Sequence, residues 1–475
     1  MKNIKLNNNL VDKNQLTKVI KDMKKISLDK PLTVEQRISA METAIRLLKN
    51  HAVELSEAYS ADFGHRAIQE TLLSDVYGSI AALEDAKENV AQWSKTETRQ
   101  SPYPNTKAYV EYQPLGLVGI MSPWNFPLVL TFAPMASALA AGNRIVIKPS
   151  EFTEKGSALL CKLVSEYFDP NIVSSIQGDA SVSALFSSLE FDHIIFTGST
   201  AVGKKVMASA ANNLTSLTLE LGGKSPVIIS DVDDIGMVAD RIMTVKAYNA
   251  GQICISPDYV LIKEEHLDDF IAKSHSFLTK TFGSFIKNKD YTSIITQPMY
   301  DRLVKMIDEA KSKGLKVIKM SEEDNNDQDR RLIPTLIINP GTDTLCMQEE
   351  IFGPILPVVV YKDIDDAINY IREFESPLAI YYFGYNQQEM TKIKQNTKSG
   401  GVVINDVMTH VLINDLPFGG VGHSGMGAYH GKDGFMNMSN KRAFFEQSAT
   451  GESNTVLRSP FDDKRIEEIN KLINS

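Results

Sequence analysis

The spacing of apolar residues predicts different elements in different parts of the chain. Between residues 38 and 59, apolar side chains recur at steps of three and four, and Thr33 and Gln36 just before them fit a capping box. This spacing predicts an amphipathic helix, and a second helix is expected to end near Trp93. Residues 108–113 then alternate between apolar and polar side chains, which predicts an edge or hairpin strand.

From residue 117 onward, short apolar runs alternate with helical segments. The apolar runs lie at residues 117–121, 145–147, 194–196, 227–229, 259–262, 333–338, 355–361 and 402–405. Strands that are apolar along their whole length are typical of parallel sheets covered by helices on both faces. The pattern therefore predicts an α/β fold of two lobes that join near residues 222–226, with residues 321–330 as a polar surface loop.

With 475 residues the chain is too long for one hydrophobic core, so two or three domains are expected. Its 59 acidic and 50 basic residues give a net charge of −9, which argues against nucleic acid or an anionic membrane as a partner. No apolar stretch is long enough to span a bilayer, and the N-terminus lacks the apolar core of a secretion signal. The three widely spaced cysteines favour a reducing, cytoplasmic compartment and predict no metal site.

Cys254 is the first candidate for chemistry. It follows a predicted helix on a turn that contains Gly251, and Glu220 interrupts an apolar run at a predicted strand end. A thiol with a separate carboxylate is the arrangement of a covalent catalyst, in which the thiol attacks and the carboxylate later activates water. On the cysteine alone, a small buried apolar residue is the competing interpretation, and it is the one that fits Cys161 and Cys346.

A glycine-rich segment, residues 196–205, follows an apolar strand and opens a helix. Backbone N–H groups and the helix dipole at such a place bind phosphate, although a glycine-rich helix start without a ligand stays an alternative. Lys205 stands where a P-loop needs Ser or Thr, which argues against an NTPase. Residues 420–425 match GxGxxG, but no strand precedes them and no apolar helix follows, so we expect no dinucleotide there.

Three further segments place polar groups at predicted strand ends or turns. Lys148 and Glu151 close an apolar strand, where open α/β sheets bind ligands, although a surface charge pair fits as well. Asn125 stands between two prolines that would hold its amide in place for an oxyanion; an ordinary turn asparagine is the alternative. Glu350 and Phe352 lie in a short acidic and apolar turn before a strand, which also fits a solvated loop start.

In combination, these segments resemble the aldehyde dehydrogenase superfamily over residues 34–445, nearly the whole chain. The resemblance is carried by Pro-Trp-Asn-Phe-Pro at 123–127, Lys-Pro-Ser-Glu at 148–151, Phe-Thr-Gly-Ser-Thr at 196–200, Leu-Glu-Leu-Gly-Gly-Lys at 219–224, Gly-Gln-Ile-Cys at 251–254, Glu-Ile-Phe-Gly-Pro at 350–354 and Pro-Phe-Gly-Gly at 417–420. Residues 254–259 and 425–431 are similar to the class 3 and coniferyl aldehyde dehydrogenase branch.

The resemblance implies a role for each candidate residue. Cys254 would be the nucleophile, Glu220 the general base for hydrolysis, and Asn125 with the Cys254 N–H the oxyanion hole. A helix end, the cofactor charge or Glu220 is expected to help the thiol ionise. The implied cofactor residues are Lys148 and Glu151 at the adenine ribose, Ser199 and its helix at the pyrophosphate, Glu350 and Phe352 at the nicotinamide ribose, together with Gly198 and Leu221.

The resemblance also implies how the chain is divided. The implied domains are a Rossmann-like cofactor-binding domain at residues 1–99 and 119–222, a catalytic domain at 223–415, an oligomerisation extension at 100–118 and 430–455, and a C-terminal tail at 456–475. The extension would be a β-hairpin formed by a strand near 108–113 and a partner near 441–446. A homodimer is the expected assembly.

The implied reaction is NAD(P)-dependent oxidation of an aldehyde to the carboxylic acid through a thiohemiacetal and a thioester on Cys254, which water then hydrolyses. The branch suggests coniferyl-type aromatic aldehydes or medium- to long-chain aliphatic ones. Glu151 would repel the 2′-phosphate of NADP, so NAD is expected to be preferred or shared. Glu220 argues against acyl transfer to coenzyme A, and the filled catalytic positions argue against a non-catalytic binding or structural descendant.

Overall fold

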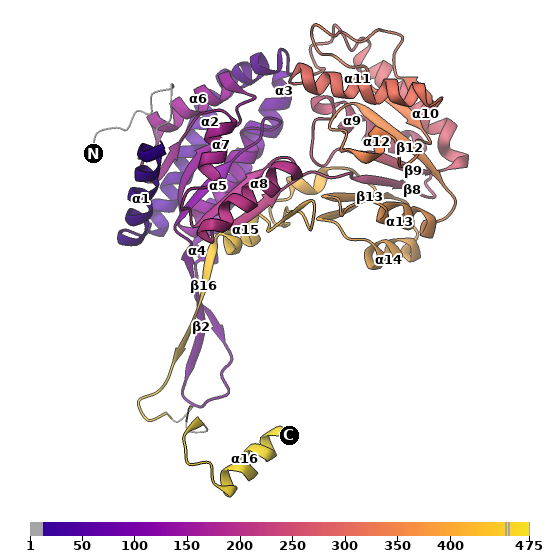
Figure 1. The fold of residues 1–475 in the computed structure, drawn as a ribbon. Helices are drawn as coiled ribbons and strands as arrows, with labels where there is room; N and C mark the ends of the chain where they lie inside the picture. Colours follow the sequence, from indigo (N-terminus) through magenta and orange to yellow (C-terminus); the bar gives the residue numbers. More distant parts are fainter. Residues whose placement is uncertain (1–12, 452–453, 455–456, 475) are drawn as a thin grey trace.

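The computed structural model describes residues 13–451, 454 and 457–474, whose strands form two large sheets and a small one (Figure 1). The first large sheet has the order β15-β7-β6-β3-β4-β5 and is parallel except for β15. Its strands are β3 (Leu117–Met121), β4 (Arg144–Lys148), β5 (Val173–Ser175), β6 (His193–Thr197), β7 (Ser216–Glu220) and β15 (Gly425–Met426). Every residue of β3, β4 and β6 is buried, as expected for a sheet covered on both faces.

Helices cover both faces of this sheet because successive strand residues point to opposite sides. Ile145 and Ile147 pack with α2, α4, α5 and α6, whereas Val146 between them packs with α1, α7 and α8. These helices are α1 (Lys13–Asp29), α2 (Val34–Phe63), α4 (Gly78–Trp93), α5 (Val129–Ala141), α6 (Glu154–Tyr167), α7 (Ala180–Ser187) and α8 (Thr200–Ala210).

The second large sheet has the order β10-β11-β12-β9-β8-β13-β14 and is parallel except for its edge strand β10. Its strands are β8 (Pro226–Ile229), β9 (Tyr259–Lys263), β10 (Lys316–Lys319), β11 (Thr335–Ile338), β12 (Ile355–Tyr361), β13 (Ala379–Phe383) and β14 (Gly401–Ile404). The helices in this lobe are α9 (Ile235–Ala247), α10 (Glu264–Phe282), α11 (Gln297–Ser312), α12 (Leu345–Gln348), α13 (Ile364–Arg372) and α14 (Gln387–Asn396).

The small sheet is a long antiparallel arm that projects from the first lobe (Figure 1). It consists of β1 (Glu97–Arg99), β2 (Lys107–Pro114) and β16 (Ser439–Glu446), and α16 (Asp463–Ile473) follows beyond its tip. The remaining elements are α3 (Ile68–Glu70), the π-helical turn η1 (Thr71–Tyr77), η2 (Ala211–Asn213), η3 (Tyr248–Gly251), η4 (Thr409–Leu412) and α15 (Gly431–Asn437).

The elements expected from the apolar pattern are confirmed. The capping box holds α2, since the Thr33 N–H donates to Gln36 Oε1 at 3.0 Å and the Gln36 N–H donates to Thr33 Oγ1 at 3.3 Å. The strand expected at 108–113 is β2, and it pairs with β16 as the predicted hairpin. Residues 420–425 form a loop that ends at the short antiparallel strand β15, so their GxGxxG pattern opens no helix.

The arrangement departs from the expected domain bounds in two places, and the rest of that division stays a prediction. The strand β1, expected in the cofactor-binding domain, pairs with β2 in the arm. The helix α15, expected in the oligomerisation extension, packs on α5 and α4 of the first lobe. In the part of the chain that the structure describes, no helix combines the length and the apolar character that a membrane span requires.

Candidate active site

The three predicted catalytic residues come from separate elements that meet between the two lobes. Asn125 follows β3 and Glu220 is the last residue of β7, and both strands flank β6 in one parallel sheet. Because the carboxyl ends of parallel strands meet at one edge, these two side chains reach the same edge. Cys254 lies between η3 and β9 of the other lobe, and the Glu220 carboxylate acts on its pKa.

The turn before Cys254 is strained and leaves no room for larger residues. Asn249, Ala250 and Gly251 have φ angles of 49°, 51° and 72°. This left-handed region costs roughly 1–2 kcal/mol for each residue that carries a Cβ. A Cβ on Gly251 would lie 2.5 Å from the Gly353 carbonyl oxygen, so glycine is required there. Consecutive strained residues persist only where the surroundings fix them, and they cluster at functional sites.

Hydrogen bonds from Gln252 fix this turn. Its side-chain Nε2 donates to the Asn249 carbonyl at 2.9 Å and to the Ser293 carbonyl at 3.1 Å, while its Oε1 accepts from the Ile295 N–H at 3.0 Å. Gln252 is completely buried, so these bonds do not compete with water. The backbone that carries Cys254 is therefore tied to a neighbouring segment of the same lobe.

Asn125 is bonded directly to the same turn. Its Nδ2 donates to the Gln252 carbonyl oxygen at 3.1 Å, and Asn249 Nδ2 donates to that oxygen at 3.2 Å and to the Asn125 carbonyl at 3.4 Å. Asn125 is 3% exposed. The Asn125 amide is therefore held by the cysteine turn itself.

The Cys254 thiol is half-buried, and its pKa is raised. Burial is the main cause, the carboxylates of Glu220 and Glu350 add to it, and the backbone N–H groups of Cys254 and Ile255 act in the opposite direction. The negative charge of Glu220 by itself therefore favours the neutral thiol. A positive charge brought by a ligand would favour the thiolate.

Glu220 is 2% exposed and ends in an unpartnered oxygen. Among the described residues, no group donates a hydrogen bond to its Oε1. Burial raises the pKa of this carboxyl well above its ordinary value, and the Gly420 N–H offsets only part of that effect. A buried carboxyl with an unpartnered oxygen is costly for stability and is suited to taking up a proton.

Glu350 lies against the backbone at the junction of the two lobes. A Cβ on Gly222 would meet Glu350 Oε2 at 2.0 Å, so the bare glycine provides the space for this carboxylate. Burial and the neighbouring Asp258 raise the pKa of Glu350 to about 8. Arg302 fixes the segment by donating to the Glu350 carbonyl at 3.0 Å and to the Ile351 carbonyl at 2.5 Å.

Phe352 connects the Glu350 segment with the Asn125 loop. Its φ of 49° turns the ring toward Trp124, which it contacts edge-on with ring centroids 5.4 Å apart. Trp124 in turn contacts Phe63 of α2. The predicted nicotinamide residues Glu350 and Phe352 therefore lie beside the predicted catalytic residues.

Lys148 and Glu151 form the pair expected at the carboxyl end of β4. Lys148 Nζ donates to the Pro149 carbonyl at 2.8 Å and lies 3.5 Å from Glu151 Oε2. Burial lowers the pKa of the lysine, and the charge of Glu151 partly restores it. Glu151 is exposed, which leaves its carboxylate free to contact a ligand at this edge.

Gly198 and Ser199 lie at the start of α8, and Leu221 follows β7 beside it. Ser199 is exposed and caps the helix, with its Oγ accepting from the Val202 N–H at 3.4 Å. The Gly198 N–H donates to the Glu220 carbonyl at 3.0 Å, which joins this helix start to β7. Leu221 packs against Gly203, where a Cβ would come within 2.7 Å of the leucine. The helix N-terminus therefore faces the same edge as Glu220.

Sequence reasoning missed a buried polar group next to this site. Lys224 Nζ contacts Asp258 and donates to the Cys346 carbonyl at 2.8 Å and to the Glu349 carbonyl at 3.0 Å. Asp258 also accepts from the Ile351 N–H at 2.9 Å. The position of Lys224 at the end of the apolar 219–224 motif was the sequence feature that could have indicated this buried group. Its function is to hold the segment that contains Glu350.

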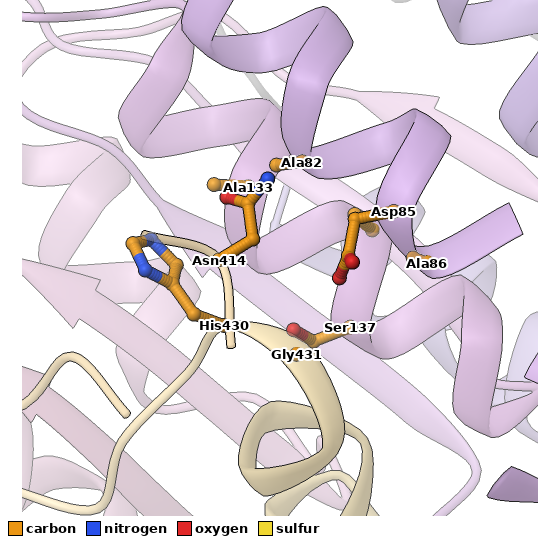
Figure 2. A pocket seen from close by; sticks show the side chains of 9 residues that line it. Ala82, Asp85, Ala86, Ala133, Ser137, Asn414, His430 and Gly431 are labelled. Atoms are coloured by element: carbon orange, nitrogen blue, oxygen red, sulfur yellow. The ribbon is translucent and has the colours of Figure 1, made fainter. Parts of the chain in front are cut away.

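A small pocket opens nearby but contains none of the predicted site residues. Figure 2 shows it between α4, α5 and the chain before α15, with Asp85, Ser137, Asn414 and His430 as its polar lining. Burial lowers the pKa of His430 to about 4, so this imidazole is neutral at physiological pH. The predicted catalytic groups thus lie outside this pocket, at the junction of the lobes.

The fold and these motifs define an α/β enzyme with a dinucleotide-type sheet, and comparisons with known proteins agree. Residues 8–444 match the model of the aldehyde dehydrogenase family. A coniferyl aldehyde dehydrogenase of Pseudomonas sp. strain HR199 is 48% identical over 462 residues, 96% of each chain. Aldehyde dehydrogenase family 3 member A2 of Pongo abelii is 38% identical over 427 residues, covering 89% of this chain and 86% of its own.

Solved structures show the same fold. Staphylococcus aureus AldH in a substrate-bound state matches with a TM-score of 0.90 and 32% identity, over 96% of this chain and 99% of its own. A betaine aldehyde dehydrogenase of Staphylococcus aureus in complex with NAD+ matches with a TM-score of 0.82 and 26% identity, over 93% and 88%.

The chain belongs to the aldehyde dehydrogenase family. It is an oxidoreductase that oxidises aldehydes with a nicotinamide dinucleotide, and the family match gives no support to a P-loop NTPase, to coenzyme A acylation or to a non-catalytic descendant.

Proposed function

We propose that this enzyme oxidises coniferyl-type aromatic aldehydes to their acids with NAD, through a thioester on Cys254. The observation that carries the mechanism is the direct bond of Asn125 Nδ2 to the turn of Cys254, at 3.1 Å from the Gln252 carbonyl. The aromatic substrate is supported by coniferyl aldehyde dehydrogenases among the relatives, at 48%, 45% and 41% identity. Medium- and long-chain aliphatic aldehydes are the second candidates, because family 3 members are also similar.

In the first step the Cys254 sulfur attacks the aldehyde carbon, and the carbonyl oxygen becomes an alkoxide. An amide NH₂ has two hydrogens, and Asn125 uses one for Gln252, so the other is available for the alkoxide. The Cys254 N–H is the proposed second donor. Preorganised donors of this kind stabilise the charge without reorganising during the reaction.

The residues at the strand edge fit a dinucleotide. Gly222 lets the Glu350 carboxylate lie against its backbone, and α8 points its N-terminus at the same edge. The proposed cofactor residues are Lys148, Glu151, Gly198, Ser199, Leu221, Glu350 and Phe352. When bound there, the nicotinamide accepts the hydride that leaves the substrate carbon. We infer a preference for NAD, or its shared use with NADP, from the exposed carboxylate of Glu151.

In the second step Glu220 takes a proton from water, and the hydroxide attacks the thioester carbon and releases the Cys254 thiolate with the acid. The raised pKa of Glu220 makes it a stronger base than an ordinary carboxylate. Its unpartnered oxygen favours hydrolysis over acyl transfer to coenzyme A, which would need no such base.

The arm supports the proposal of a homodimer. It exposes Tyr103 and Phe445, whose rings contact each other edge-on with centroids 6.1 Å apart. Exposed aromatic residues on a projecting sheet are typical of protein interfaces. Three free cysteines support a cytoplasmic location. Light scattering of the purified enzyme should give twice the mass of the chain, and a monomer would contradict the dimer.

The substrate proposal is tested by kcat/KM for coniferyl aldehyde, benzaldehyde and hexanal, each with NAD and with NADP. Coniferyl aldehyde with NAD should give the highest value, and chromatography should identify ferulic acid as the product without added coenzyme A. A higher kcat/KM for hexanal than for coniferyl aldehyde would show that aliphatic aldehydes are the preferred substrates. Activity that requires coenzyme A would contradict the hydrolytic role of Glu220.

A further inference from the structure

Behind the cysteine turn lie three charged side chains that the mechanism does not use. Arg66 and Asp75 are completely buried, and Glu70 is 6% exposed. Arg66 and Glu70 precede the π-helical turn η1, and Asp75 lies within it; such turns are rare and found frequently at functional sites. Arg66 Nη1 lies 3.2 Å from Asp75 Oδ2, and its guanidinium lies 5.1 Å from the ring of Phe63 and 5.0 Å from that of Phe126.

Glu70 reaches the turn that carries Cys254. Its Oε1 accepts from the Asn249 N–H at 2.8 Å, and its Oε2 accepts from Thr292 Oγ1 at 2.6 Å. Asn249 is the first left-handed residue of the strained turn. A carboxylate therefore fixes the backbone of the second lobe at the point where the turn begins, and it does so from the first lobe.

Asp75 reaches the loop that carries Asn125. Its Oδ1 accepts from the Leu128 N–H at 2.9 Å and from the Val129 N–H at 3.0 Å. These groups begin α5, whose cap residue Leu128 offers no side-chain acceptor of its own. Asp75 therefore satisfies the open N–H groups of the helix that directly follows Asn125.

Arg66 acts on both carboxylates through its charge, and it is ion-paired with Asp75. Its positive charge lowers the pKa of both Glu70 and Asp75, against the larger effect of burial. An isolated buried charge is costly, and Arg66 is the positive charge that favours the ionised form of both acceptors. A buried ion pair contributes little net stability compared with apolar packing, so its main effect is expected on geometry.

We propose that Arg66, Glu70 and Asp75 are positioning residues that set the separation between the Cys254 sulfur and the Asn125 amide. The inference rests on the roles proposed above for Cys254 and Asn125. Glu70 fixes the sulfur side and Asp75 fixes the amide side, while the ion pair with Arg66 holds the Asp75 carboxylate in place. A displacement of about 1 Å at a reacting centre costs on the order of a hundredfold in rate.

The decisive experiment measures the burst of NADH formed in the first turnover. Glu70→Ala should slow this burst about ten- to a hundredfold and leave the KM for NAD unchanged. Glu70→Gln, which keeps an acceptor for the Asn249 N–H, should recover most of the rate. Thr292→Val removes the second bond of Glu70 together with the acceptor of the Ala67 N–H. It should give a smaller loss and serves if Glu70→Ala does not fold.

The matched control is Glu389→Ala. Like Glu70, Glu389 accepts two hydrogen bonds, here from Ser230 Oγ at 2.6 Å and from Tyr382 Oη at 2.7 Å. These bonds lie at the carboxyl ends of β8 and β13, whereas Cys254 precedes the parallel strand β9. This variant should keep the burst rate of the parent. An equal loss in Glu389→Ala would show a general effect on folding and would overturn the positioning role.

A double-variant cycle separates this inference from the proposed function. If Glu70 acts by aligning the thiol with the Asn125 amide, Glu70→Ala should have a much smaller effect in an Asn125→Ala background. Equal effects in both backgrounds would overturn the inference while leaving the mechanism intact. Cys254→Ser, measured in parallel, tests the mechanism itself. Full activity of this variant would show that Cys254 is not the nucleophile, independently of the role of Glu70.

Discussion

The turn that carries Cys254 is buried and fixed by hydrogen bonds, whereas the edge that carries Glu151 is partly exposed to solvent. At the turn, Gln252 is completely buried and bonded on both sides, and its carbonyl oxygen receives the Asn125 amide. At the edge, Ser199 and Glu151 are exposed, and the ammonium of the buried Lys148 has its polar contacts with the adjacent Pro149 carbonyl and Glu151.

The difference separates the two tasks of the enzyme. Bond formation needs atoms fixed to within fractions of an ångström before the substrate arrives, which a buried hydrogen-bonded turn provides. A cofactor must enter and leave, so its contacts stay exposed and are ordered only on binding, at a cost in affinity. Changes at the turn should therefore act on rates and be large, whereas changes at the edge should act on affinity and be small.

The largest effect should come from Cys254→Ser. Loss of a catalytic nucleophile typically costs about 10⁴-fold or more in kcat, and binding of NAD should persist. Steady-state NADH formation and NAD titration by fluorescence measure the two quantities. Cys161→Ser is the control, because burial raises the pKa of that thiol to about 11 and it has no proposed role. Comparable losses in both variants would contradict a unique nucleophile.

Glu220→Gln should lower steady-state turnover by about 10²- to 10⁴-fold, the usual contribution of a general base. The first-turnover burst of NADH should remain, since thioester formation does not need this carboxylate. Mass spectrometry should then detect the acyl group on Cys254. A variant that lost the burst as well would show that Glu220 is needed before hydrolysis.

The raised pKa of Glu220 also predicts the sign of the pH dependence. The carboxyl binds a proton below its pKa, and only the ionised form can act as a base. Because burial moves that pKa upward, the range over which hydrolysis rises with pH should lie at higher pH than for an ordinary carboxyl, with a slope of about tenfold per unit below the pKa. The rate of thioester hydrolysis in single turnovers, measured against pH, tests this rise. The rise should be absent in Glu220→Gln.

Asn125→Ala should slow thioester formation by about a hundred- to a thousandfold, the typical cost of one oxyanion donor. The variant also leaves the Gln252 carbonyl with one donor fewer, although Asn249 Nδ2 still reaches that oxygen. The burst rate measures the loss, and the KM for NAD should not change. A rise in KM without a fall in rate would assign Asn125 to binding instead.

Much of the fold could be predicted because its strands are short, apolar and separated by helices. The helix α1 was missed, since its buried residues Leu16, Ile20 and Met23 stand among lysines that obscure their helical spacing. The short strand β1 was missed for a related reason: its three residues, from Glu97 to Arg99, carry two charges and pair only through the arm.

The site could be predicted where chemistry and motif coincide, as at Cys254. The buried group of Arg66, Glu70 and Asp75 could not be predicted, because charges at these spacings normally indicate a solvated face. Their burial depends on the second lobe, which supplies the Asn249 N–H and the Thr292 hydroxyl. Such tertiary partners leave no pattern in the local sequence.

The smallest effect should come from the exposed edge. Glu151→Gln should raise kcat/KM for NADP relative to NAD about fivefold, because a like charge near the 2′-phosphate costs about 1 kcal/mol in water. Its kcat should stay constant, since the edge acts on binding alone. The control Glu154→Gln removes a charge from the first turn of α6, where we propose no cofactor contact, and should leave the NADP to NAD ratio unchanged. An equal shift of the NADP to NAD ratio in both variants would mean that the preference depends on the overall charge of this surface and not on Glu151. A fall in kcat for Glu151→Gln would mean that the edge is coupled to the cysteine turn.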